Sequence, residues 1–153
     1  AFAGLAANGS IVTWGSSVTG GSGAPTGTGY TKITSNNNAF AALRWDGSIT
    51  AWGNTGFGGS GAPTGSGYKA ISSTTQAFAA LKADGSITAW GNATSGGVNA
   101  PTDAGYVRIY AMRDAFAAIK APGFQLSKSA LTTSSDSAAR AYRSSGLGRS
   151  RSL

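Results

Sequence analysis

The segment AFAALKADGSITAWG, residues 77–91, decides the fold of this chain because it is repeated. Close copies begin at Ala1 (AFAGLAANGSIVTWG) and at Ala39 (AFAALRWDGSITAWG), and a partial copy, AFAAIKAPG, begins at Ala115. The copies are 38 residues apart each time, without insertions. A fixed period of this length indicates a repeat architecture, in which each repeat is one supersecondary unit that packs on its neighbours.

Within one repeat, the pattern predicts three or four short β-strands. The run YKAISS (68–73) is β-prone, AFAALKA (77–83) is mostly apolar, and SITAWG (86–91) follows an Asp-Gly dipeptide. Asp-Gly between two apolar runs predicts a hairpin with a type I′ turn. No segment has a helical period. We therefore expect an all-β fold in which tandem repeats form consecutive β-propeller blades, a partial propeller, with a β-solenoid as the alternative.

The repeat pattern predicts a boundary after residue 121. The array comprises units 1–38, 39–76 and 77–114 and the start of a fourth unit at 115. From Pro122 the template is lost, and no Trp-Gly follows. Residues 122–153 are rich in Ser and Arg, which predicts a degenerate or disordered tail. The abrupt change suggests a truncated or frame-shifted fragment of a longer array, and we expect self-association through its open blade faces.

Composition narrows the possible functions. The net charge is +7, but residues 1–119 carry six basic and four acidic side chains, so the excess charge belongs to the tail. The chain has neither His nor Cys, which removes the commonest general base at neutral pH and all thiolate chemistry. No apolar run approaches the length of a membrane span. We expect no cofactor, no metal, no membrane partner and no enzymatic activity, and nucleic acid is not the expected partner.

Residues that recur in register have a structural interpretation. Trp14, Trp52 and Trp90 are expected to pack between blades as buried side chains, with a sugar-stacking platform as the alternative. Asp46 and Asp84 begin hairpin turns, and Asn8 occupies the same position. A catalytic carboxylate pair would need two acids converging on one site, and one acid in each equivalent turn does not provide this.

The variable loops are better candidates for binding, because a repeat keeps its core positions and lets its binding loops differ. One loop follows Trp-Gly (16–19, 54–57 and 92–95), and the other precedes Ala-Phe (36–38, 74–76 and 112–114). The binding residues predicted from these loops are Asn54, Thr55, Phe57, Asn92, Thr94, Gln76 and Asp114.

The order of Leu81-Lys82, Gly85, Ile87, Trp90-Gly91 and Pro101 resembles the repeat of the regulator of chromosome condensation family. The resemblance covers residues 1–121 and is closest to short-bladed bacterial members, which include a propeller-type inhibitor of β-lactamase. It implies a propeller fold, and in that inhibitor the corresponding loops lie on the protein-binding face. The chain departs from the family in having Phe40 and its equivalents near the usual His, and Gly-Gly in place of Gly-Gln.

These observations predict a noncatalytic binding or structural module of a secreted or surface-exposed bacterial protein. We expect it to bind a protein or a glycan through loops on one propeller face. The alternatives are a propeller enzyme of the lyase or hydrolase type, and an exchange-factor or chromatin role by family analogy.

Overall fold

The computed structural model describes residues 1–122, and this part of the chain consists of short strands and single 3-10 turns without an α-helix. The expected all-β class is therefore confirmed, whereas residues 123–153 of the predicted tail lie outside the described range. Over residues 1–122, no helix has the length and hydropathy needed to cross a bilayer. The strands are β1 (Phe2–Leu5), β2 (Ile11–Trp14), β3 (Tyr30–Ser35), β4 (Ala39–Arg44), β5 (Ile49–Gly53), β6 (Tyr68–Ser73), β7 (Ala77–Lys82), β8 (Ile87–Gly91), β9 (Tyr106–Ala111) and β10 (Phe116–Lys120).

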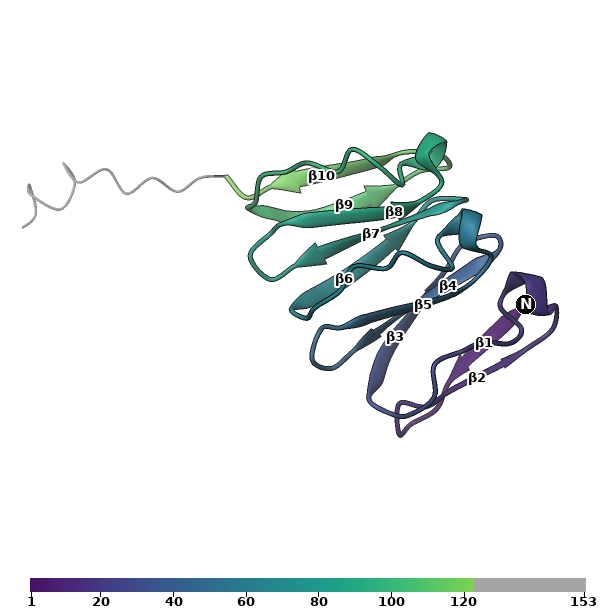
Figure 1. The fold of residues 1–153 in the computed structure, drawn as a ribbon. Helices are drawn as coiled ribbons and strands as arrows, with labels where there is room; N and C mark the ends of the chain where they lie inside the picture. Colours follow the sequence, from purple (N-terminus) through teal and green to yellow (C-terminus); the bar gives the residue numbers. More distant parts are fainter. Residues whose placement is uncertain (123–153) are drawn as a thin grey trace, which may run out of the picture. The chain divides into compact units, whose positions relative to one another are not determined.

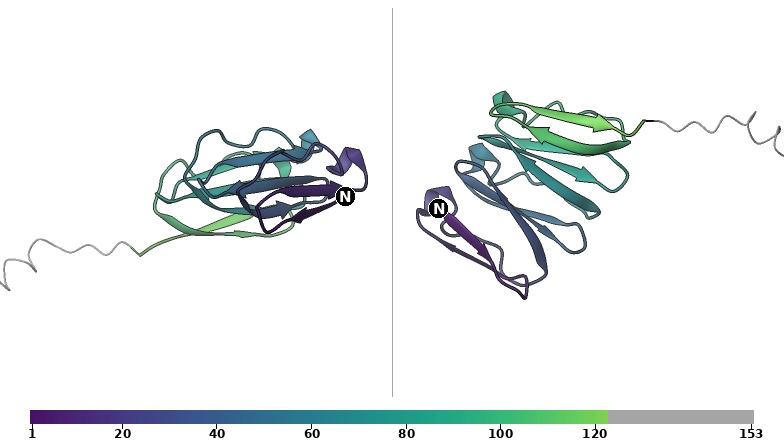
Figure 2. Two further views of the ribbon diagram at one scale, coloured as in Figure 1. Left: turned by 90° about the horizontal axis from the view of Figure 1, so that it is seen from below. Right: turned by 180° about the vertical axis from the view of Figure 1, so that it is seen from behind.

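The strands form four small antiparallel sheets, which we number in chain order (Figure 1). The second sheet is β3-β4-β5 and the third is β6-β7-β8. The first sheet, β1-β2, and the fourth, β10-β9, have two strands each within the described residues. The two views of Figure 2 show the sheets following one another as successive layers, so each sheet packs against its sequence neighbours.

The hairpin turns are not of the predicted type I′. The Gly47 N–H donates to the Arg44 carbonyl, and the Arg44 N–H donates to the Ser48 carbonyl, both at 2.9 Å. The φ angle is positive at Gly47 (80°) but not at Asp46. The connection is therefore a three-residue loop, a type I turn followed by a left-handed glycine. A Cβ at Gly47 would lie 2.5 Å from the Gly67 nitrogen, so the backbone that leads into β6 also requires glycine here.

The middle strands of the complete sheets are buried on both faces. In β4 the residues alternate, as strand geometry dictates. Ala39, Ala41 and Leu43 belong to a core shared with the third sheet. Phe40 and Ala42 belong to a second core shared with the first sheet. Alanine at three of these five positions lets adjacent sheets approach closely, which explains why the apolar run is continuous and not alternating.

Tryptophan links consecutive sheets. The Trp52 indole N–H donates to the Gly20 carbonyl at 3.1 Å, and Trp90 donates to the Gly58 carbonyl at 3.0 Å. Both indoles are buried, at 4% and 5% exposure, as expected. The prediction is wrong for Trp14, which is 54% exposed. Trp52 and Trp90 are each covered by the loop of the preceding repeat, whereas Trp14 lies in the first repeat of this chain.

Candidate binding surface

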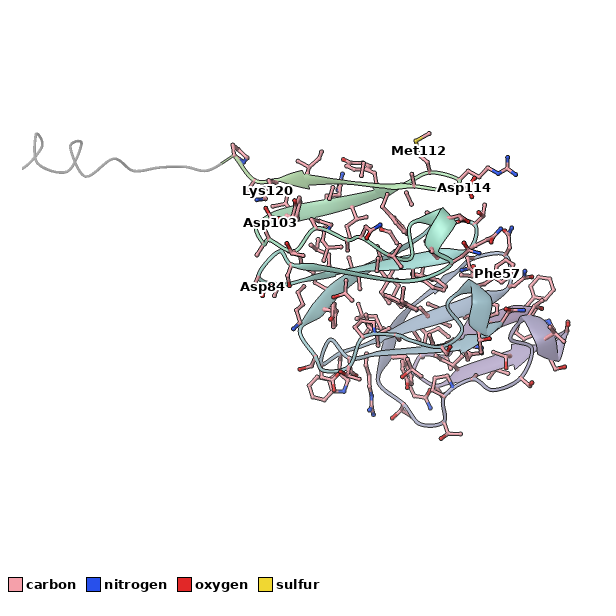
Figure 3. All side chains as sticks on the ribbon, turned by 45° about the horizontal axis from the view of Figure 1, so that its top comes forward. Phe57, Asp84, Asp103, Met112, Asp114 and Lys120 are labelled. Carbon is pink, nitrogen blue, oxygen red and sulfur yellow. The ribbon has the colours of Figure 1, made fainter. Side chains whose placement is uncertain are left out.

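The variable loops lie together at one end of the sheets, which we call the loop end. There β3, β6 and β9 turn into the next strand, and β5 and β8 run into the single-turn 3-10 helices η2 (Thr55–Phe57) and η3 (Ala93–Ser95). Figure 3 shows Phe57 and Asp114 at this end, and Asp84 at the opposite end, which we call the hairpin end. Topology thus brings both predicted loop sets to one surface.

The 3-10 turns are held by asparagine caps. The Asn54 side-chain Oδ1 accepts from the Gly56 N–H at 3.0 Å, and the Asn92 Oδ1 accepts from the Thr94 N–H at 2.9 Å. The Thr94 hydroxyl also donates to Asn92 at 2.7 Å. Asparagine is favoured here because its short side chain reaches the unpaired donors of a helical first turn. The two asparagines therefore shape the loops.

Within each complete sheet, the two kinds of loop are joined to each other. The Asn36 side-chain amide donates to the Phe57 carbonyl at 2.6 Å. In the next repeat the buried Thr74 hydroxyl donates to the Ser95 carbonyl at 2.8 Å. Different residue types make the same connection, so the link between the loops persists while their side chains vary.

Hydrogen bonds also join the loops of successive sheets. The Asn37 N–H donates to the Thr75 carbonyl at 3.3 Å, and the Thr75 N–H donates to the Arg113 carbonyl at 2.9 Å. The Asp114 Oδ1 accepts from the hydroxyls of Thr75 and Ser95, at 3.0 and 3.1 Å. The loop end is consequently one hydrogen-bonded row that crosses three sheets.

All seven predicted binding residues lie at the loop end, but they differ in what they offer a ligand. Four are half-buried and serve the fold, through caps, core packing or the main chain: Asn54, Asn92, Phe57 and Gln76. Three are exposed: Thr55, Thr94 and Asp114. The smaller exposed set is the better description of the surface.

The seven predicted residues leave out three strongly exposed side chains of the same variable loops. Met112 is 78% exposed, and Val18, in the first 3-10 turn, is 67% exposed. The Arg113 side chain is 87% exposed and lies 3.6 Å from the Asp114 carboxylate. Among the six variable loops, residues 112–114 alone carry charged side chains. That change from Asn-Asn-Asn and Thr-Thr-Gln to Met-Arg-Asp is the sequence signal that identifies them.

The recurring aspartates at the hairpin end are turn residues. The Asp46 Oδ1 accepts from the Ser48 N–H at 2.9 Å and the Ser48 hydroxyl at 2.7 Å. The corresponding bonds of Asp84 to Ser86 are 2.8 and 2.7 Å. These bonds lower the pKa of both carboxyls below its ordinary value. In residues 1–122, no cluster of acidic side chains assembles that could hold a metal ion.

The hairpin end also carries a repeated contact between a cation and an aromatic ring. Lys82 lies over the Tyr68 ring at 5.3 Å and Lys120 over the Tyr106 ring at 5.2 Å, and Arg44 makes the same contact with Tyr30 of its own sheet. Lys120 also pairs with Asp103, which lowers the pKa of that carboxyl. Because the contact recurs in the second, third and fourth sheets, it is a packing feature.

In comparisons with models of protein families, with curated proteins and with solved structures, none matches this chain. The resemblance to the regulator of chromosome condensation family therefore stays a prediction from the repeat motif.

Proposed function

We propose that this chain is a noncatalytic binding module built from propeller blades, which engages a protein partner through its loop end. The observation that carries the proposal is the hydrogen-bonded row of loops, from Asn37 through Thr75 to Arg113. A rigid row with different exposed side chains in each repeat is how repeat proteins combine a fixed scaffold with a specific surface.

The propeller interpretation is supported by how the repeats join. Each complete sheet has three antiparallel strands, and neighbouring sheets pack face to face without sharing a hydrogen-bonded ladder. In a β-solenoid, successive coils would add strands to common parallel sheets. Blade-like packing also agrees with the Leu-Lys, Gly, Ile and Trp-Gly pattern of the regulator of chromosome condensation family, to which we propose that the chain is related.

A protein partner fits the surface better than a glycan. Sugar binding through the recurring tryptophans needs open indole faces, and Trp52 and Trp90 are buried. The loop end instead exposes Val18, Met112 and Arg113. Methionine and arginine are enriched at protein interfaces, where a flexible thioether and a planar cation adapt to a partner surface. By analogy of composition, we place the module on a secreted or surface-exposed bacterial protein.

The noncatalytic part of this proposal is supported by how the recurring aspartates are used. Asp46 and Asp84 each bond to the serine two residues later in their own turns, so they do not converge on one substrate. Glycosidic bond cleavage by a carboxylate pair needs two such groups facing one reacting bond.

Photo-cross-linking tests the proposal. A benzophenone side chain at position 37 of the full chain should capture a partner from bacterial surface and medium fractions. The purified partner should then bind the unmodified chain. Met112→Ser/Arg113→Ser should weaken this binding at least tenfold, about 1.4 kcal/mol, with an unchanged melting temperature. Both side chains are strongly exposed, so folding should not suffer.

The matched control is Trp45→Ser/Lys69→Ser, which removes one exposed apolar side chain and one cation away from the loop end. Equal loss of binding in both double variants would contradict the proposal. So would binding to a panel of soluble glycans that disappears on Trp52→Ala while the chain stays folded.

A further inference from the structure

In the fourth sheet, β10 is the equivalent of the middle strand of a complete sheet. Within residues 1–122 it is paired on one side only. In the third sheet, β7 pairs with both β6 and β8, and Phe78 lies opposite Trp90 while Leu81 lies opposite Ile87. In the fourth sheet, β10 pairs with β9, and residues 1–122 contain no strand on its other edge. The positions equivalent to Ile87 and Trp90 are Gln125 and Lys128, so the sequence does not repeat the strand there.

The face of β10 that points away from the third sheet is also exposed. Leu81 of β7 is 2% exposed, whereas the equivalent Ile119 is 51% exposed. Ala79 is buried, and the equivalent Ala117 is exposed. Within residues 1–122, the edge of β10 therefore has main-chain groups without a partner strand, next to an exposed apolar sheet face.

A pocket of about 230 Å³ lies beside β10, between the third and fourth sheets. Its walls are mostly apolar and include Ile87, Ala89, Val98, Tyr106 and Phe116. A cavity of roughly 150 Å³ already holds benzene, so this pocket has room for an indole.

Between the second and third sheets, the position equivalent to this pocket is filled by a tryptophan. There the Trp90 indole stacks on Phe78 with ring centroids 5.3 Å apart, and its N–H donates to the Gly58 carbonyl. In the pocket, Phe116 and Gly96 are the residues equivalent to Phe78 and Gly58. The Gly96 carbonyl accepts no hydrogen bond from residues 1–122. The pocket thus offers a ring to stack on and an acceptor for an indole N–H.

We propose that the free edge of β10 and the adjacent pocket form a binding site for an extended peptide strand of a partner protein, with the pattern Ile-Thr-Ala-Trp-Gly. The strand pairs antiparallel with β10 and places its tryptophan opposite Phe116 and its isoleucine opposite Ile119. The indole enters the pocket and donates to the Gly96 carbonyl. The main chain supplies affinity, and the pocket supplies specificity for tryptophan.

The chain itself fills the equivalent site with this pattern twice, in the same register. Phe40 lies opposite Trp52 in the second sheet, just as Phe78 lies opposite Trp90 in the third. The tryptophans of those two copies are buried in their own sheets, so a second folded copy of this chain does not offer them. The third copy, Ile11–Trp14, is already paired with β1, and its tryptophan stacks on Phe2.

The test uses the complete 153-residue chain and a fluorescein-labelled synthetic peptide, Gly-Ser-Ile-Thr-Ala-Trp-Gly-Asn. The peptide should bind, and its Trp→Ala counterpart should bind at least tenfold more weakly. Backbone N-methylation on the β10-facing side should also weaken binding at least tenfold, because it removes ladder donors. Amide exchange over Phe116–Lys120 should slow when the peptide is bound.

A pocket variant with little effect on folding completes the experiment. Val98→Trp fills the pocket from a half-exposed position and should abolish tryptophan-dependent binding. Failure of the complete chain to bind the peptide would overturn the proposal. If binding then emerged on Phe124→Ser/Leu126→Ser, the chain's own segment would be the occupant. Binding indifferent to the peptide's tryptophan, or a dimer that the peptide does not compete with, would overturn it equally.

Discussion

The first and second sheets contain the same aromatic pair in different surroundings. Phe2 stacks on Trp14 with centroids 5.6 Å apart and planes at 14°, and Phe40 stacks on Trp52 at 5.2 Å and 16°. Each pair joins facing residues of one hairpin. Yet Trp14 is 54% exposed and Trp52 only 4%. Stacking is therefore a property of the hairpin, whereas burial comes from the neighbouring repeat.

The neighbour contributes a loop as well as a sheet face. Gly20, which ends the 3-10 turn of the first repeat, lies so close to the second sheet that a Cβ there would be 2.7 Å from the Phe40 ring. Its carbonyl accepts the Trp52 N–H. The stability of this array should thus reside mainly in the contacts between sheets, as nearest-neighbour energetics of repeat proteins require.

The largest effect should come from removing one member of a covered pair. Trp90→Ala should lower the free energy of unfolding by about 3–5 kcal/mol, because a buried indole and its hydrogen bond are both lost. Trp14→Ala should cost about 1 kcal/mol, because that indole is half in water. Urea denaturation of the two variants measures the difference. Equal losses would show that stacking within the hairpin, and not the neighbouring repeat, carries the energy.

A smaller effect on stability should follow from adding a methyl group where two sheets are in close contact. Gly58→Ala places a methyl group 2.8 Å from the Phe78 ring, at a φ of 86°. Gly61→Ala is the matched control, because its φ is 79° and nothing lies within 4 Å. Both variants carry the left-handed backbone cost, roughly 1–2 kcal/mol. Gly58→Ala should lose about 1–3 kcal/mol more than Gly61→Ala through overpacking. Thermal melts measure the difference. A melting temperature of Gly58→Ala equal to or above that of Gly61→Ala would contradict this close packing.

Removing the buried Thr74 hydroxyl at the loop end should lower the free energy of unfolding. Thr74→Val keeps the shape but leaves the Ser95 carbonyl and the Ala77 N–H without their partner, at a cost of about 1–3 kcal/mol. Thr55→Val, at an exposed position of the same surface, should change stability by less than about 0.5 kcal/mol. Chemical denaturation distinguishes the two, and an unaffected Thr74→Val would mean that the loops are not joined through this bond.

The smallest effect concerns the hairpin turns and pH. The lowered pKa of Asp46 means that its stabilising contribution is present above the pKa of the unfolded chain and is lost as the pH falls through the folded-state value. Asn8 makes the same two bonds with a neutral amide, at 3.0 and 2.8 Å. Asp46→Asn should therefore leave the melting temperature at pH 7 nearly unchanged.

Below about pH 4, Asp46→Asn should lose less stability than the unmodified chain, because the amide does not protonate. Asp46→Ala is the control that removes the acceptor and should lower the melting temperature already at pH 7. Identical acid profiles for the unmodified chain and Asp46→Asn would show that the turn carboxylate does not contribute to acid sensitivity.

Much of the fold and part of the site follow from local sequence. The 38-residue period, the strand runs and the exchange of Asn8 for Asp46 are encoded within single hairpins, where residues that interact lie a few positions apart. The grouping of loops at one end also follows, because both loop types lie at the same strand ends once the sheet is antiparallel.

Only the tertiary structure decided which loop residues meet solvent and which serve the fold. Asp114 bonds to Thr75, 39 positions away, and Trp90 to Gly58, 32 positions away. The burial of Trp52 and the exposure of Trp14 likewise depend on whether a neighbouring sheet is present, although the local sequences are nearly the same. Sequence patterns specify the hairpins. The free energy gained by burying their faces depends on contacts between repeats, and composition and repeat period do not give the geometry of those contacts.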